Sequence, residues 1–537
     1  MKSSSEKRNA SNQEKPNVLF VICDDLNNAI SGMGREPCAP APNLQRLMNE
    51  GIRFTNAHNN CPICLPSRNS MLSGLYAHTT GHYTLWDAWR TTTHIHTTSG
   101  WRNQYSNKPL LGDAVMMPKH FKDNGYNTFG VGKIHHEGRV DPDWWTDYAY
   151  GPDYGPYLWD SIRNSQQAHP DRLWLYEGEP MLSYAERYEG LDRFFIDGRE
   201  YRHHIEMSFG SLPEIFGRDG LDIRNGDRTP YRYVNDDNRG LLPDEKNAEW
   251  AVDILGQKHE EPFFLGVGFM KPHTPLNAPQ RFFDMFPLDD IQLPPFLEND
   301  CDDCARALVE NRPYGFLVYD MILKGGEVMW RKWLQSYLAC IEFMDEQLGR
   351  ILDALDKSPY RDNTIVIFTS DSGYHMGEKS YIFKDTLWEE ADQIPLIIKA
   401  PGVTHANSIC TQPVSLIDLY PTLIDLCNLP SEPHTLTHGH PLEGHSLRPF
   451  LKDPQDRDWS GPSVALTSLR GDTGVHNSVR SQRFRYTLCQ NGEEELYDHS
   501  IDPYEWHNIA SDLSYRDVKA DLRNQMIKLI NLSDGLA

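Results

Sequence analysis

The amino-acid sequence predicts an α/β fold in which a large, mostly parallel β-sheet carries helices on both faces. Short apolar runs rich in branched residues, typical of buried parallel strands, recur at 17–23, 127–131, 263–269 and 364–369. Helical stretches alternate with these runs, and the longest is an amphipathic helix expected at 333–357. A chain of 537 residues is long enough for a large domain and a smaller one.

Capping residues predict where two further helices begin and end. In the stretch 41–52, Asn43 is suited to cap the first turn, and Gly51 stands where a helix commonly stops. In the stretch "CPICLPSRNS", Pro66 fits the first position of a helix that ends near Gly74.

Composition divides the chain into a leader, a large domain and a smaller C-terminal part. Residues 1–15 are polar and predict a disordered leader, followed by a domain at 16–455. Stretches dense in aromatic residues at about 76–110 and 139–245 are expected to be long insertions in that domain. The remaining residues, 456–537, predict a C-terminal α+β subdomain with an antiparallel sheet and a closing helix.

The net charge of −24 argues against nucleic acid and anionic membrane surfaces as partners. No apolar run reaches the roughly 18 residues of a membrane span. The first residues contain no hydrophobic signal core, so we expect a periplasmic or secreted location if a signal peptide has been removed, and otherwise a cytoplasmic one. The ten cysteines do not resemble a disulfide framework, and Cys301 with Cys304 predicts either a local disulfide or two free thiols.

Each of the four predicted strands runs directly into residues with reactive side chains. Because the carboxyl ends of parallel strands lie at one edge of a sheet, residues distant in sequence are expected to converge there. These residues are Asp24 and Asp25, Lys133 and His135, Lys271 and His273, and Asp371 with Ser372.

Three of these side chains are carboxylates, and three close carboxylates repel one another unless a cation lies among them. Oxygen ligands favour a hard ion, so Asp24, Asp25 and Asp371 predict a calcium or magnesium site. A metal combined with basic side chains is suited to hydrolysis of a phosphate or sulfate ester. The basic side chains are Lys133, His135, His273 and Lys384.

Cys64 is placed just before a predicted helix N-terminus, where backbone N–H groups favour an anion. Arg68, one turn further on, adds a positive charge, and reactive cysteines occupy such electropositive positions. Cys61 is expected to be a small packing residue. The aromatic insertions, which include Trp86 and Trp101, fit either self-packed loops or a platform on which sugar rings stack.

Taken together, these residues resemble the type I, formylglycine-dependent sulfatases of the alkaline phosphatase superfamily. "CLPSR" matches the sulfatase signature C-x-P-S-R, and four further blocks match in order from residue 16 onward. These blocks are "PNVLFVICDDLN", "GVGKIHHEG", "GFMKPHTPLNAP" and "SDSGYHMGEK" with its continuation to "IIKAPG". The KPH block is most similar to the iduronate-2-sulfatase-like branch, whose members act on sulfated sugars.

The resemblance implies an alkaline-phosphatase-like fold and a nucleophile made from Cys64. A formylglycine-generating or sulfatase-maturing enzyme would oxidise Cys64 to formylglycine. One hydroxyl of the hydrated aldehyde would attack sulfur, and the other would allow collapse to the aldehyde and release of sulfate. Arg68 and Lys133 would hold the hydrate, and His135 is the candidate base for the collapse.

The resemblance also implies how the substrate and the metal are bound. His273 would protonate the leaving sugar oxygen, and Lys384 would contact the sulfate. Lys133 would also bind substrate, and Trp86 and Trp101 are expected to contact the saccharide. Calcium would be held by Asp24, Asp25, Asp371 and the modified Cys64, with Ser372 where the family usually has Asn or His. The expected activity is hydrolysis of a carbohydrate sulfate ester; the alternative is a phosphonate or phosphodiester hydrolase.

Overall fold

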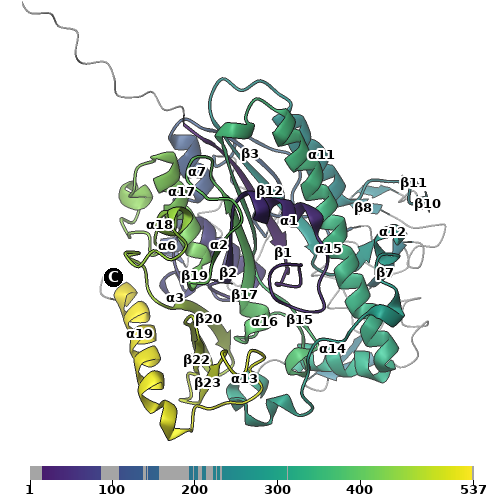
Figure 1. Ribbon diagram of the computed structural model, residues 1–537, viewed down its shortest axis with the longest axis vertical. Coiled ribbons are helices and arrows are strands. Elements are labelled where there is room, and N and C mark those ends of the chain that lie inside the picture. The colour runs from purple at the N-terminus through teal and green to yellow at the C-terminus, as the bar shows by residue number, and fades with distance from the viewer. Residues whose placement is uncertain are drawn as a thin grey trace, which may run out of the picture.

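A computed structural model describes residues 15–85, 108–136, 141, 143–155, 193–196, 199–202, 209–212, 222–224, 227–229, 233–310 and 313–534. These residues form a nine-stranded sheet with helices on both faces and a separate four-stranded antiparallel sheet near the C-terminus (Figure 1). The predicted α/β fold class is confirmed. Trp86, Trp101, residues 1–14 of the predicted leader and much of both predicted insertions lie outside the described residues.

The four predicted strands lie side by side at the centre of the large sheet. They are β1 (Asn17–Asp24), β3 (Asn127–Gly132), β12 (Phe263–Pro272) and β14 (Thr364–Ser370). Their order is β14-β1-β12-β3, and each neighbouring pair is parallel. Their carboxyl ends therefore lie at one edge of the sheet, as the sequence predicted.

The rest of the large sheet makes it mixed rather than wholly parallel. Strand β17 runs antiparallel to both β14 and β2. These outer strands are β2 (Ile52–His58), β4 (Asp147–Tyr148), β17 (Gln393–Lys399), β18 (Ser408–Cys410) and β19 (Val414–Ser415). Residue patterns had not predicted them, because an apolar run shows neither the partner of a strand nor its direction.

Each face of the sheet buries a separate hydrophobic cluster. Side chains of β1 alternate between the two, with Val21 in one and Phe20 in the other, as the two-residue period of a strand requires. One cluster contains residues of α1 (Pro42–Glu50), α11 (Pro243–Leu255) and α15 (Gly326–Lys357). The other contains residues of α2 (Cys64–Ser73), α7 (Met117–Asp123), α17 (Leu419–Cys427) and α18 (Arg448–Lys452).

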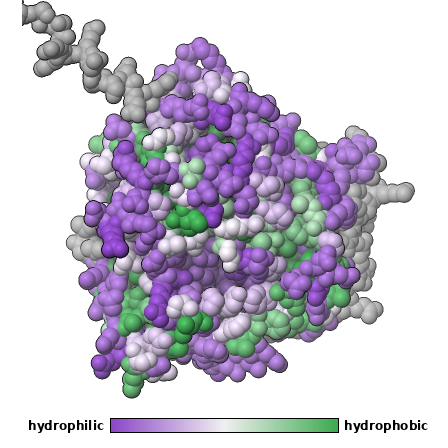
Figure 2. Space-filling view, viewed as in Figure 1, coloured by the Kyte–Doolittle hydropathy of each residue, from purple (hydrophilic) through white to green (hydrophobic). Residues whose placement is uncertain are grey.

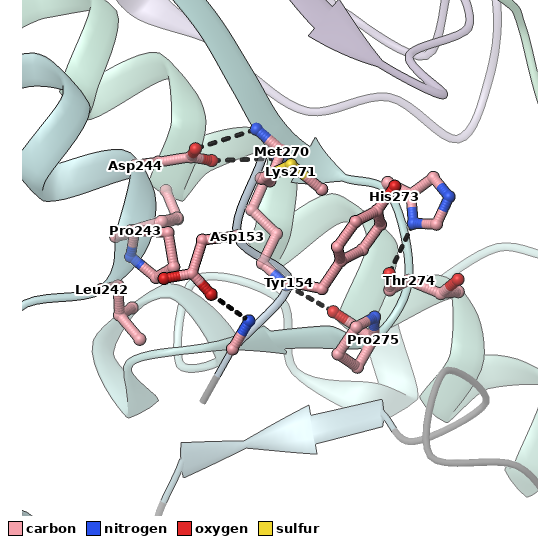
Figure 3. A pocket seen from close by; sticks show the side chains of 12 residues that line it. Asp153, Tyr154, Leu242, Pro243, Asp244, Met270, Lys271, His273, Thr274 and Pro275 are labelled. Carbon is pink, nitrogen blue, oxygen red and sulfur yellow. Dashed lines mark hydrogen bonds between the residues drawn. The ribbon is translucent and has the colours of Figure 1, made fainter. Parts of the chain in front are cut away.

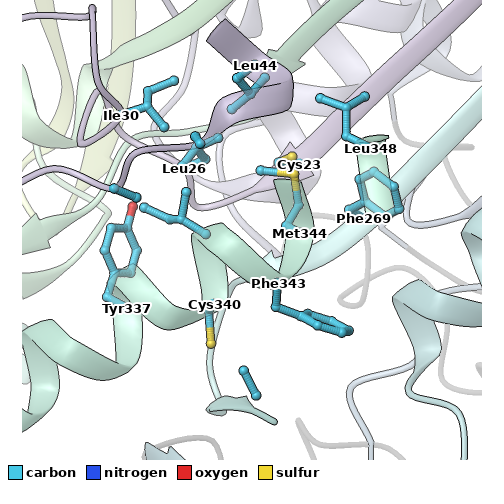
Figure 4. Close-up of a cluster of buried hydrophobic side chains, with 14 of the residues drawn as sticks. Cys23, Leu26, Ile30, Leu44, Phe269, Tyr337, Cys340, Phe343, Met344 and Leu348 are labelled. Carbon is cyan, nitrogen blue, oxygen red and sulfur yellow. The ribbon is translucent and has the colours of Figure 1, made fainter. Parts of the chain in front are cut away.

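The long amphipathic helix is confirmed as α15, which begins at Gly326, earlier than predicted. Its buried stripe packs in the same hydrophobic cluster as the end of β1 and as α1. Figure 4 shows Met344 and Leu348 of α15 in this cluster, together with Cys23 of β1 and Leu44 of α1. Burying each such side chain contributes about 1.5–3 kcal/mol, so this helix anchors the strand that leads into Asp24 and Asp25.

The helix predicted at 41–52 is present as α1, but the predicted cap is wrong. Ala41, in the left-handed conformation (φ 43°), occupies the N-cap position. The backbone N–H groups of Asn43 and Leu44 donate to the carboxylate of Asp345 in α15, at 2.9 and 2.8 Å. An acid from a distant helix thus satisfies the unpaired donors of the first turn, which no local pattern indicates.

The C-terminal sheet is an antiparallel meander of β20 (Ala465–Gly471), β21 (Gly474–Arg480), β22 (Phe484–Leu488) and β23 (Glu494–Asp498). Helix α19 (Arg516–Asp534) lies along it (Figure 1). An antiparallel sheet with a closing helix is therefore confirmed, whereas the domain boundary near residue 456 stays a prediction.

The remaining short elements lie mostly in connections. The helices are α3 (Ala77–Thr80), α6 (Pro109–Gly112), α12 (Gln280–Phe283), α13 (Arg306–Glu310), α14 (Pro313–Lys324) and α16 (Glu389–Asp392). The strands are β5 (Arg193–Ile196), β6 (Arg199–Arg202), β7 (Phe209–Ser211), β8 (Asp222–Arg224), β9 (Asp227–Thr229), β10 (Tyr233–Asn235), β11 (Asn238–Arg239), β13 (Leu276–Ala278), β15 (His375–Met376) and β16 (Ile382–Phe383). The 3-10 turns are at 288–290, 300–303, 361–363, 378–380, 416–418, 433–436 and 513–515.

On the face shown in Figure 2, hydrophilic residues cover most of the surface and hydrophobic residues gather in separate patches. None of the helices in the described residues combines the length and the apolar character that crossing a bilayer requires. All ten cysteines are free thiols, including Cys301 and Cys304. Cys61 is fully buried in a hydrophobic cluster, as expected of a packing residue.

A buried ion network joins the C-terminal sheet to the large domain. The guanidinium of Arg485 in β22 is fully buried and binds Glu505 and Asp392, each at 2.6 Å, and also Glu389. Glu389 and Asp392 are the end residues of α16, and the carbonyl of Ala391 in the same helix accepts from the N–H of Gly373 at 2.9 Å. The network therefore braces the loop that follows β14.

Replacing Arg485 with methionine is expected to lower the free energy of unfolding by about 3–5 kcal/mol, because it leaves three buried carboxylates without their shared cation. Burial would raise the pKa of Glu505, but Arg485 and His499 lower it to about 2 from 4.5. The ionised Glu505 therefore contributes to the free energy of unfolding above pH 4.5, and this contribution is lost as the pH falls toward 2. In Arg485→Met the pKa of Glu505 rises, so acid unfolding should begin at higher pH.

Urea unfolding at neutral pH and an acid titration followed by circular dichroism measure both effects. Arg523→Met is the matched control, because Arg523 lies 3.6 Å from Glu494 and is half exposed, so its loss should cost less than about 1 kcal/mol. Equal destabilisation by the two variants would contradict the role of the buried network.

Candidate functional site

Cys64 is the first residue of α2, not the residue before it as predicted. The helix starts earlier because Ile63 is the N-cap, and its carbonyl accepts from the N–H of Ser67 at 3.0 Å. Pro66 is consequently the third residue of the helix, and Gly74 ends it in the left-handed conformation (φ 70°), as predicted. Cys64 is almost completely buried at the positive end of α2.

Arg68, one turn after Cys64, is fully buried and connects α2 to three strand ends. Its Nε donates to Asp371 Oδ2 at 2.7 Å, and a terminal nitrogen lies 3.6 Å from Asp24 Oδ1. The guanidinium also donates to the carbonyls of Cys23, at 3.0 Å, and of Lys133. One side chain thus holds the ends of β14, β1 and β3 against the first turns of α2.

The three predicted carboxylates converge at this edge of the sheet. Ligand atoms of Asp24, Cys64 and Asp371 lie within 4.8 Å of one another, as do those of Asp24, Asp25 and His273. The backbone N–H of Asp25 also donates to Asp371 Oδ1 at 3.2 Å. Asp24 Oδ1 is buried and has no hydrogen-bond partner among the described residues. A buried carboxylate oxygen without a hydrogen bond, among other carboxylates, belongs to the donor set that a hard cation takes.

Ser372 lies beside these carboxylates. Its hydroxyl donates to Asp25 Oδ1 at 3.0 Å and approaches Asp371 Oδ1 at 3.4 Å. His375 contacts other residues: its Nε2 lies 2.7 Å from the hydroxyl of Thr386 and its ring packs against Tyr381. These contacts are those of a packing residue.

Three of the predicted basic residues contact the carboxylates. Lys133 Nζ forms an ion pair with Asp24, and Lys384 Nζ pairs with Asp25 and lies 3.8 Å from Asp24 Oδ1. His273 Nε2 lies 3.7 Å from Asp25 Oδ2. Positive and negative groups from β1, β3, β12 and the loop after β16 therefore meet at one place.

His135 follows the same strand as Lys133 but has different contacts. Its ring packs against Trp144 and Trp145, with centroid separations of 5.2 and 5.9 Å. Neither ring nitrogen has a hydrogen-bond partner in the part of the chain that the structure describes. Burial and the charge of Arg68 lower the pKa of His135 to about 3, so the imidazole is neutral at physiological pH. Its role as a base stays a prediction.

Burial and neighbouring charges shift the acidic pKa values in opposite directions. Burial would raise the pKa of Asp24, but Lys133, His273, Lys384 and Arg68 hold it well below its usual range. For Asp25, burial prevails over Lys384 and raises the pKa to about 8. Burial also raises the pKa of the Cys64 thiol, although Lys384 and Lys133 oppose the shift. The raised pKa keeps the Cys64 side chain mainly in the neutral thiol form.

Sequence reasoning missed Tyr154, which belongs to this site. Its hydroxyl accepts from Lys133 Nζ at 2.8 Å, and its ring packs edge-on against His273 with centroids 5.2 Å apart. Figure 3 shows Tyr154 and His273 side by side on a pocket that Lys271 and Asp244 also line. Tyr154 stands in "GPDYGPY", a part of the sequence that is dense in aromatic residues, and no motif distinguishes Tyr154 from the other aromatic residues there.

Lys271, in the same block as His273, supports the loop rather than the carboxylates. Its Nζ donates to the carbonyl of Pro275 in the following turn (Figure 3) and to Asn277 Oδ1 in β13 at 3.1 Å. The backbone N–H groups of Met270 and Lys271 donate to Asp244 at 2.8 and 2.9 Å. These bonds hold the segment that presents His273.

Two family descriptions match the chain. The family described as Sulfatase matches residues 16–429, and the one described as N-sulphoglucosamine sulphohydrolase, C-terminal, matches residues 377–532. The first match includes every predicted site residue.

Curated relatives match over almost the whole chain. A sulfatase of Formosa agariphila is 30% identical over 514 residues, covering 94% of this chain and 84% of the relative. Human iduronate 2-sulfatase is 28% identical over 591 residues, covering 95% and 93%.

Solved structures share the fold at lower identity. One, in complex with its substrate D-glucosamine-2-N,6-O-disulfate, has a TM-score of 0.65 and 21% identity and covers 97% of this chain and 99% of its own. The phosphonate monoester hydrolase of Agrobacterium radiobacter has a TM-score of 0.65 and 19% identity, covering 97% and 96%. With the family match, the relatives and the fold in agreement, the chain belongs to the sulfatase family as a type I sulfatase, a sulfuric ester hydrolase.

Proposed function

We propose that this enzyme hydrolyses a sulfate ester on a carbohydrate, a sulfated polysaccharide or oligosaccharide. The observation that carries the proposal is the meeting of Asp24, Asp371 and Cys64 with Lys133 and Lys384 at one sheet edge. Fixed positive side chains can bind a sulfate group despite the net charge of −24. Human iduronate 2-sulfatase and the structure with a bound glucosamine disulfate support a saccharide as substrate.

The carboxylates are proposed to hold calcium, with magnesium as the alternative ion. Asp24, Asp25 and Asp371 would be ligands, joined by the side chain at position 64 and by Ser372. Asp24 Oδ1 lacks a hydrogen bond, and the ligand atoms of Asp24, Cys64 and Asp371 lie within 4.8 Å of one another, which fits a small hard cation. A cation bound there would draw negative charge from the sulfate oxygens and so favour attack on sulfur.

Cys64 is proposed to be converted to formylglycine by a formylglycine-generating or sulfatase-maturing enzyme. As a thiol it is buried with a raised pKa, so little thiolate forms at neutral pH. The aldehyde hydrate would supply a nucleophilic hydroxyl and a second hydroxyl for release of sulfate. Arg68, fixed by Asp371 and two backbone carbonyls, places a permanent positive charge beside that position.

The remaining basic side chains are proposed to bind the sulfate group or to transfer protons. Lys133 and Lys384 would bind sulfate oxygens from two sides, because their ammonium groups reach Asp24 and Asp25 respectively. His273 borders the pocket of Figure 3 and is proposed to donate a proton to the leaving sugar oxygen. Burial lowers the pKa of the free imidazole well below its usual value, so the anionic substrate would have to favour the protonated ring. His135 is proposed as the base of the second step, because neither of its ring nitrogens has a hydrogen-bond partner among the described residues, although burial and Arg68 disfavour its protonated form.

Replacing Cys64 with alanine is expected to lower sulfate release from sulfated oligosaccharides by more than about 1,000-fold, because a methyl side chain cannot be converted to the aldehyde hydrate. Sulfate is measured by ion chromatography over a panel of sulfated oligosaccharides. Mass spectrometry of the wild-type peptide containing position 64 should show the aldehyde in place of the thiol. Cys61→Ser is the matched control and should retain the modification. Activity in Cys64→Ala comparable to the wild type would contradict the assignment.

Replacing Asp371 with asparagine is expected to weaken calcium binding at least about 10-fold, since one charged ligand is lost. Ser372→Asn should strengthen it, because an amide oxygen is a better calcium ligand than a hydroxyl. Isothermal titration with calcium measures both affinities, and Glu260→Gln, an exposed acid, is the control. Unchanged affinity in Asp371→Asn, with an unchanged melting temperature, would exclude this cation site.

The structural neighbour that hydrolyses phosphonate monoesters favours a second candidate function, phosphonate or phosphodiester hydrolysis. A sulfate ester, a phosphodiester and a phosphonate monoester each carry one negative charge, so the charges of Lys133 and Lys384 do not distinguish them, and the relatives described as sulfatases favour the sulfate ester. We therefore expect kcat/KM for an aryl sulfate to exceed that for the matched aryl phosphodiester and phosphonate monoester. The comparison needs one enzyme preparation, with Cys64→Ala as the blank for each ester. A strong preference for the phosphorus esters would replace the sulfatase assignment.

A further inference from the structure

Tyr154 has contacts with two residues of the proposed reaction. It is buried, and its hydroxyl accepts a hydrogen bond of 2.8 Å from Lys133 Nζ. The same ammonium lies 4.9 Å from the centre of the tyrosine ring. The ring also meets His273 edge-on, at 5.2 Å and an interplanar angle of 73°. Lys133 and His273 follow the neighbouring strands β3 and β12, so one side chain contacts residues at both strand ends.

Lys133 needs such a neighbour because its side chain is long and flexible. A lysine side chain has about 2 kcal/mol of rotamer entropy to lose when it is held in one position. Its other partner, Asp24, is shared with Arg68 and Lys384 and is a proposed cation ligand. The phenol of Tyr154 carries no charge and is not a proposed cation ligand, so it can hold the ammonium whether or not Asp24 binds a cation.

His273 has a comparable need for orientation. Its Nδ1 lies against the carbonyl of Thr274, which leaves Nε2 directed to the side of Asp25. A proton donor must lie within hydrogen-bond reach of the leaving oxygen, so a small rotation of the ring would reduce transfer. The edge of Tyr154 restricts that rotation.

We propose that Tyr154 is a positioning residue that acts on both partners. Its hydroxyl holds the Lys133 ammonium toward the sulfate, and its ring holds the His273 imidazole toward the leaving oxygen. The inference rests on the roles proposed above for Lys133 and His273. It differs from simple packing, because the hydroxyl and the ring then have separable effects on the reaction.

Two variants separate these effects. Tyr154→Phe removes the hydroxyl and keeps the ring, so kcat/KM should fall by roughly 10-fold for every sulfate ester, the scale of one hydrogen bond to a charged group. Tyr154→Leu also removes the ring. In this variant kcat/KM should fall by a further factor of roughly 10 or more, but only for esters with poor leaving groups such as sugar alcohols, because these leaving groups need protonation. For nitrophenyl sulfate, Tyr154→Leu and Tyr154→Phe should be alike.

Tyr126→Phe is the matched control. Tyr126 precedes β3 at the opposite end from Lys133, and its hydroxyl donates to the carbonyl of Pro16 at 3.1 Å. This variant loses a hydroxyl bond of the same kind but should keep the rates of all esters. Melting temperatures of the three variants show whether folding is intact.

The measurement is kcat/KM over a series of sulfate esters whose leaving groups span a wide range of pKa. A steeper dependence on leaving-group pKa in Tyr154→Leu than in Tyr154→Phe and the wild type supports the proposal. Rates in Tyr154→Phe within twofold of the wild type, or equal losses for all esters in Tyr154→Leu, overturn it. Failure of the wild type to release sulfate from any ester would instead overturn the proposed function, and this inference with it.

Discussion

The buried guanidinium of Arg68 is the interaction on which the arrangement of the site depends. Burying a charge costs several kcal/mol unless it is paired and fully hydrogen-bonded. Arg68 meets that condition with Asp371, the nearby Asp24 and the carbonyls of Cys23 and Lys133. Because these partners end three different strands, satisfying one side chain aligns β14, β1 and β3. The same bonds hold the first turn of α2, and Cys64 with it, over the sheet edge.

The charges around Arg68 explain how an acidic protein can accept an acidic substrate. Lys133 and Lys384 are buried or nearly so, and nearby carboxylates raise the pKa of Lys133 even though burial alone would lower it. The two ammonium groups therefore stay charged where water cannot screen them. The local field at the site is set by these fixed groups, whereas the net charge of −24 is a sum over the whole chain.

The C-terminal sheet contributes to the same site through backbone contacts. Arg485 binds both ends of α16, and the carbonyls of Glu390 and Ala391 in that helix accept from the N–H groups of Tyr374 and Gly373. These two residues continue directly from Asp371 and Ser372. The loop with two proposed cation ligands is thus held from one side by Arg68 and from the other by a sheet that joins the chain almost 100 residues later.

The sequence by itself determined the four central strands of the large sheet, the residue types at their ends and the signature around Cys64, because periodicity and short motifs are local properties. It also implied that Asp24 and Asp371 meet, since parallel strands share an edge. Only the tertiary structure decided the antiparallel direction of β17, the capping of α1 by Asp345 and the place of Tyr154 between a lysine and a histidine. Each of these is a contact between segments far apart in the chain. No local pattern specifies which distant residue will pair with a strand, accept a hydrogen bond from a helix N-terminus or pack between two side chains.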